Sequence, residues 1–81
     1  MTQQERIESI NNYIKNYPSE LPFRSVDYDT LCNDPNALNL TIDFIIGLFM
    51  KIGLSDGLAP SMDGIILDSC LEFLTELKEK Q

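Results

Sequence analysis

The chain has 81 residues, of which 43% are hydrophobic and 23% are charged, and its formal net charge is −7. This length gives a single domain, residues 1–81, with a small core and no room for a deep cleft, which argues against an enzyme with a buried active site. The excess of acids repels the phosphates of nucleic acids and of anionic lipids, so direct binding to DNA, RNA or a membrane is not expected.

The first segment predicts an amphipathic helix that ends before Pro18. Thr2 and Glu5 have the spacing of a capping box, in which each side chain accepts a hydrogen bond from a free backbone N–H at the helix start. Pro18 stops the helix because its ring clashes with the preceding turn and it has no N–H to donate. The apolar stripe of this helix is formed by Ile7, Ile10, Ile14 and Tyr17, with Tyr13 beside it.

Residues 18–33 leave two alternatives open. Asp27 fits the N-cap of a short helical turn that continues through Leu31 and Cys32. A brief extended run over residues 23–28 is the alternative, and we favour the turn.

The pattern Asn33-Asp34-Pro35 predicts the start of a longer helix, because a capping side chain precedes a proline at the first helical position. We expect this helix to end near Ile52, with Gly53 as a left-handed cap. It is apolar on nearly all sides, so we expect it to be the central helix, residues 34–52, buried among its neighbours. Its main stripe is predicted to be Leu38, Ile42, Ile45, Phe49 and Ile52. Its apolar part, residues 38–54, is shorter than the roughly 20 residues of a membrane span and contains Asn39, Asp43 and Lys51, so we expect no span.

A last helix is predicted to begin after Ser61, which is a suitable N-cap. Its inner face is expected to carry Met62, Ile66, Cys70, Phe73, Leu74 and Leu77. Asp68, Glu72 and Glu76 recur at four-residue spacing on the opposite, solvent side. The sequence therefore predicts an all-α fold, a compact bundle of three main helices plus a short helical turn.

The chemistry of catalytic and metal sites is poorly represented in the sequence. No histidine occurs, which removes the commonest general base and the commonest zinc ligand. Residues 27–38 fail the calcium-loop pattern, and the four glycines fit no phosphate-binding loop. We therefore expect no enzyme, no catalytic residue, no cofactor and no metal. With no CxxC pair and no apolar leader, we expect a cytoplasmic protein in which Cys32 and Cys70 are free structural thiols.

The uneven charge suggests a function. Residues 25–77 contain nine acids and one base, Lys51. Such a surface favours a protein partner with a basic surface, as expected for an acidic inhibitor or adaptor of the immunity, antitoxin-like or phage-inhibitor type. The alternatives are a self-associating homodimer with a structural or regulatory role, and acidity that serves only solubility. We predict that the partner contacts the loop acids and one aromatic residue: Asp27, Tyr28, Asp29, Asp34, Asp56 and Asp63.

Overall fold

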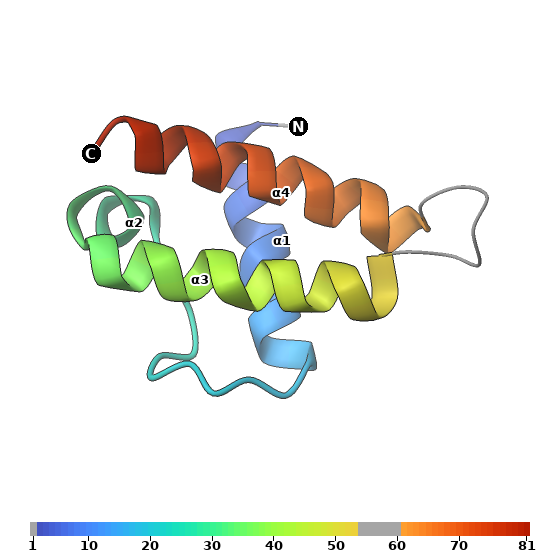
Figure 1. Cartoon of the computed structure of the whole chain (residues 1–81). Helices are drawn as coiled ribbons and strands as arrows, with labels where there is room; N and C mark the ends of the chain where they lie inside the picture. Colours follow the sequence, from blue (N-terminus) through green and yellow to red (C-terminus); the bar gives the residue numbers. More distant parts are fainter. Residues whose placement is uncertain (1, 54–60) are drawn as a thin grey trace.

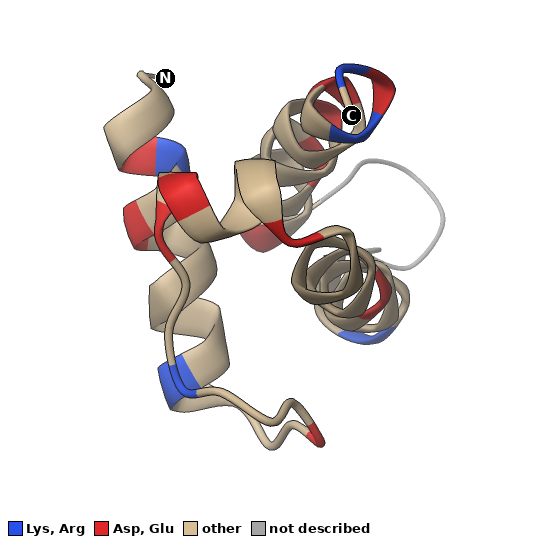
Figure 2. Cartoon of the chain, turned by 90° about the vertical axis from the view of Figure 1, so that its left-hand side faces the viewer, with Lys and Arg blue, Asp and Glu red and all other residues tan. Residues whose placement is uncertain are grey.

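Residues 2–53 and 61–81 are described by the structure, a computed structural model, and their regular elements are all helical (Figure 1). The helices α3 and α4 lie alongside each other, and α1 crosses behind them at a steep angle (Figures 1 and 2). This confirms the predicted all-α bundle of three main helices and one short turn. The elements are α1 Gln3–Asn16, α2 Tyr28–Asn33, α3 Pro35–Leu48, the π-helical turn η1 Phe49–Gly53, and α4 Met62–Glu79.

The capping box predicted for α1 is present. The backbone N–H of Glu5 donates to Thr2 Oγ1 at 3.2 Å, and the backbone N–H of Thr2 donates to Glu5 Oε1 at 3.3 Å. The structure differs from the predicted stripe at the two tyrosines: Tyr13 is buried, whereas Tyr17 is only partly buried. The buried face of α1 is formed by Ile7, Ile10, Tyr13 and Ile14.

The segment between α1 and α2 is held to α1 by one side chain. The Asn11 amide donates to the carbonyl oxygen of Val26 at 2.9 Å and accepts from its N–H at 2.8 Å. Asp27 then caps α2 by accepting from the backbone N–H of Thr30 at 2.7 Å. The helical turn is therefore confirmed, and the extended alternative for residues 23–28 is not observed.

Gly53 is the last residue of the helical stretch, but it is not the cap that was predicted. Its φ does not lie in the left-handed region, so the expected left-handed cap is wrong. A Cβ at this position would lie 3.2 Å from Gly64 Cα and 2.8 Å from the Phe49 ring. A glycine is needed because the backbone of η1 passes close to the backbone of α4.

The core lies between α4 and the other helices, since α4 packs against α1, α2, α3 and η1. The fully buried side chains include Ile10, Leu31, Leu38, Ile45, Leu67, Cys70 and Leu74. Inner positions predicted for α4 are confirmed at Cys70, Phe73, Leu74 and Leu77, but the prediction for Met62 is wrong because it is 74% exposed.

The helix α3 buries one side only, which corrects the expectation that it is surrounded by neighbours. Its buried residues are Ala37, Leu38, Thr41, Ile45 and Leu48. The predicted stripe is thus rotated, and Ile42 and Phe49 are only partly buried. Ile46 and Met50 are 45% and 67% exposed. Part of the apolar surface of this helix is left uncovered by the described chain.

Candidate protein interface

Two of the predicted contact acids have structural roles as helix caps. Asp27 caps α2, and the N–H of Thr30 holds the pKa of its carboxyl below the ordinary value. Asp34 caps α3 by accepting from the backbone N–H groups of Asn36 and Ala37, each at 3.1 Å. A carboxylate that already accepts these hydrogen bonds gains less free energy from pairing with a cationic partner. Both acids are therefore weaker candidates for contact residues.

The predicted aromatic anchor, Tyr28, is partly committed to the fold. Its ring is half-buried and packs on Phe73 with ring centroids 6.4 Å apart and planes inclined by 29°. The Arg6 guanidinium also lies over the Phe73 ring, 6.0 Å from its centroid. The neighbouring Asp29 is exposed, as are the capping acids Asp27 and Asp34, so the α2 end presents exposed acids beside a ring that is only partly accessible.

Asp63 was predicted to be a loop acid, but it lies in the first turn of α4. Its Oδ1 accepts a hydrogen bond of 2.9 Å from the Tyr13 hydroxyl, which ties α4 to α1. Burial and this hydrogen bond raise the pKa of Tyr13 above its ordinary value. Asp56, the remaining predicted contact, lies outside the described residues. The use of these six residues as a contact surface stays a prediction.

The acids as a whole are distributed over α1, α2, α3 and α4 (Figure 2). Charge alone therefore does not define a site on this molecule. A candidate interface needs a second feature that distinguishes one acidic region from another.

That second feature is an apolar stripe on the uncovered side of α3 and η1. Ile42, Ile46, Phe49 and Met50 have the spacing i, i+4, i+7 and i+8, which places them along one side of a helix. Ile46 and Met50 are exposed, and Ile42 and Phe49 are partly buried at the edge of the core. The sequence pattern did not reveal this second stripe, because it assigned Ile42 and Phe49 to the core.

The close approach of Gly53 and Gly64 fixes the register between this stripe and α4. The two helices are antiparallel and rise about 1.5 Å per residue. Ile46 precedes Gly53 by as many residues as Leu71 follows Gly64, so the two lie at the same level. Leu71 is partly buried and packs against the core. The apolar seam, as we call it, consists of Ile42, Ile46, Phe49, Met50 and Leu71.

Exposed acids border the apolar seam on both helices. Asp43 precedes Ile46 and Met50 by three and seven positions, so it lies beside them on α3. On α4, Asp68 lies one turn before Leu71 and is level with Phe49 by the same register; Glu72 follows one turn after Asp68. Two bases lie near the ends of the seam: Lys51, which follows Met50 in the chain, and Lys78, two turns beyond Leu71.

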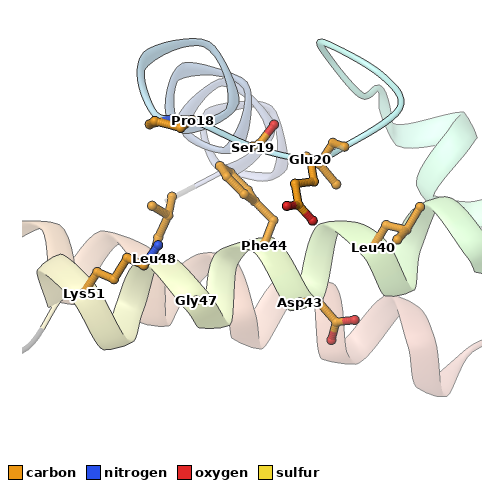
Figure 3. Close-up of a pocket in the computed structure, with 10 residues that line it drawn as sticks. Pro18, Ser19, Glu20, Leu40, Asp43, Phe44, Gly47, Leu48 and Lys51 are labelled. Carbon is orange, nitrogen blue, oxygen red and sulfur yellow. The ribbon is translucent and has the colours of Figure 1, made fainter.

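A second surface lies on the other flank of α3. The segment 18–21 faces α3 across an open groove of about 590 Å³, and Phe44 points from α3 toward that segment (Figure 3). Its apolar lining includes Leu40, Phe44 and Leu48, and its charged lining is Glu20, Asp43 and Lys51. Because both signs of charge line this groove, its charge favours neither a basic nor an acidic partner.

The two thiols are free, as predicted. Burial raises the pKa of Cys70 to about 11, so this thiol is protonated at neutral pH. Its Sγ lies 3.8 Å from the carbonyl oxygen of Arg6. Cys32 is partly buried beside Tyr28. A protonated, enclosed thiol is a poor nucleophile, so Cys70 fits a structural role.

The helical stretch Pro35–Gly53 is apolar and long enough to cross a bilayer by length and composition, with mean hydropathy 1.3, which corrects the expectation that it is too short and too polar. A third of it is buried inside the fold. Core helices of soluble proteins meet the same criterion, so this stretch is weak evidence for a membrane span.

Comparison of the chain with known proteins gives no match to a family model, to a curated protein or to a solved structure.

Proposed function

We propose that this domain is a non-enzymatic protein-binding module that acts in the cytoplasm by covering a basic surface on another protein, as an inhibitor or an adaptor does. The observation that supports this is the apolar seam bordered by Asp43, Asp68 and Glu72. Exposed apolar groups in a continuous stripe provide affinity. The surrounding acids select a partner of opposite charge and speed the encounter.

This proposal moves the contact surface away from the loops. Asp27, Asp34 and Asp63 are engaged in capping or in a hydrogen bond to Tyr13. The acids on the outer sides of α3 and α4 accept no such bonds in the described part of the chain and stand beside uncovered Ile and Met side chains. A partner can therefore pair with them at less cost to the fold.

Self-association is the second candidate, and the same uncovered stripe favours it. A second copy would bury Ile46 and Met50 against their equivalents. It would also bring two sets of acids together, which opposes the contact at low ionic strength. The solution mass separates the two candidates, because the homodimer requires twice the chain mass of 9.2 kDa.

The test of the binding function is capture from native lysate followed by binding kinetics with the purified partner. Ionic strengths of about 0.15 M and about 1 M should be compared, because charge screening shortens from ~8 Å to ~3 Å between them. We expect a partner with a basic surface and an association rate that falls steeply with salt. An acidic partner, or binding that is indifferent to salt, would show that the acidity serves solubility only.

A further inference from the structure

We infer that the apolar seam is a docking site for an amphipathic helix of the partner, with apolar residues on one face and Lys or Arg on both flanks. This inference rests on the proposed binding function and names the partner chemistry that the seam recognises.

The apolar seam has the elongated shape that a docked helix needs. From Ile42 to Met50 the stripe runs for about two helical turns, and Leu71 on the neighbouring helix α4 is level with its middle. Two antiparallel helices with apolar residues along their junction form a shallow, elongated surface. A helix laid along such a surface inserts side chains at i, i+3, i+4 and i+7, which is a common mode of peptide recognition. Met50, with its flexible side chain, adapts to an incoming apolar residue.

The charges beside the seam select among possible occupants. Asp43 stands on the α3 side, and Asp68 and Glu72 stand on the α4 side, all exposed. A helix with Lys or Arg on both flanks places a cation opposite each border. A second copy of this chain places acids against acids, and an anionic membrane places phosphates against them. Of these three occupants, the basic amphipathic helix is the one that satisfies both the apolar and the charged parts of the surface.

The experiment uses the isotope-labelled whole chain and three synthetic helix-forming peptides of about 18 residues, roughly five turns. One carries a Leu stripe flanked by Lys and Arg, the second carries the same stripe flanked by Glu, and the third has Ala in place of Leu. We expect only the first to bind well, with backbone NMR shifts confined to residues 39–50 and 68–78. Equal binding of the Glu-flanked peptide, no binding of the basic peptide, or shifts centred on residues 18–21 would overturn the inference.

Matched variants locate the contact. Ile46→Ala with Met50→Ala should weaken binding of the basic peptide about tenfold or more, the ratio that 1.4 kcal/mol produces. The control, Met62→Ala, is compared with Met50→Ala alone and removes a methionine side chain that is 74% exposed. Met62 lies seven positions before Ser69, which accepts a hydrogen bond from Arg6 of α1, so it is on the α1 side of α4 and away from the seam. This control should leave affinity unchanged. Circular dichroism verifies that all variants fold. Equal weakening by Met50→Ala and Met62→Ala would contradict the assignment.

Other occupants are tested with the same proteins. A dimer mass that reverts to the monomer mass in the Ile46→Ala, Met50→Ala protein would assign the seam to a second copy instead. Sedimentation with phosphatidylserine vesicles would assign it to a lipid surface. If a captured basic protein binds in a salt-sensitive manner but is unaffected by these two substitutions, the seam inference fails while the proposed function stands. If no salt-sensitive partner exists, the proposed function itself fails.

Discussion

Replacing Leu74 by Ala tests whether α4 organises the core. Leu74 is fully buried on the helix that packs against every other element. Removal of a buried Leu side chain costs about 2–5 kcal/mol, because the transfer energy of the lost methyl groups is joined by the cost of the cavity. A domain of this length has a free energy of unfolding of about 4–12 kcal/mol. The substitution should therefore remove a large part of the stability.

The assay is urea unfolding followed by circular dichroism, together with a thermal melt. A loss of about 3 kcal/mol should lower the Tm by roughly 12–24 °C, since each kcal/mol shifts a domain of this size by about 4–8 °C. Met62→Ala is the matched control, because it truncates a side chain of similar size on the same helix at a 74% exposed position. It should change stability by less than about 0.5 kcal/mol. Equal midpoints for the two variants would refute the assignment of the core.

Three further predictions concern local structure. Gly53→Ala should destabilise the fold by about 1–3 kcal/mol through overpacking between η1 and α4, measured by urea unfolding; an unchanged midpoint would disprove the close approach. In native protein, iodoacetamide should modify Cys32 well before Cys70, whose pKa burial raises to about 11, as read by mass spectrometry; equal rates would contradict the enclosed thiol. Asp27→Ala should lower the Tm while Asp29→Ala should not. Because folding lowers the pKa of Asp27 from 3.8, its contribution is present above that pH and is lost as the pH falls below it, so the two variants should melt alike in acid.

The helix boundaries were predictable because their signals are local. A capping side chain and the N–H groups it satisfies lie within three residues of each other, so Thr2, Asp27, Asp34 and Ser61 could be assigned from the sequence. The role of Gly53 could not be assigned in this way. Its requirement comes from a contact with another helix, and no local pattern distinguishes such a glycine from a left-handed cap.

The candidate interface was harder to predict because α3 is apolar at most positions. Two overlapping stripes, one through Leu38 and Ile45 and the other through Ile46 and Met50, satisfy helical spacing equally well. Only the packing of α4 shows which of them is covered. The loop acids were favoured because loops often carry contacts, but two of them, Asp27 and Asp34, also fitted helix caps.

The non-local hydrogen bond between Tyr13 and Asp63 was likewise beyond sequence reasoning. The two residues are 50 positions apart, and each has an ordinary local interpretation, as a flanking aromatic residue and as an acid near a helix start. Their pairing shows how a carboxylate that sequence analysis counts as free surface charge can instead connect two helices.

The most direct test of the binding surface is photo-crosslinking in native cells from a reactive residue placed at position 50, with position 62 as the control. Both native residues are exposed methionines, at 67% and 74%, but they lie on different helices. We expect position 50 to crosslink to one protein through a helical segment rich in Lys and Arg, and position 62 to crosslink to it weakly or not at all. Equal crosslinking from both positions, or crosslinks from position 50 to an acidic segment or to a second copy of the chain, would contradict the account.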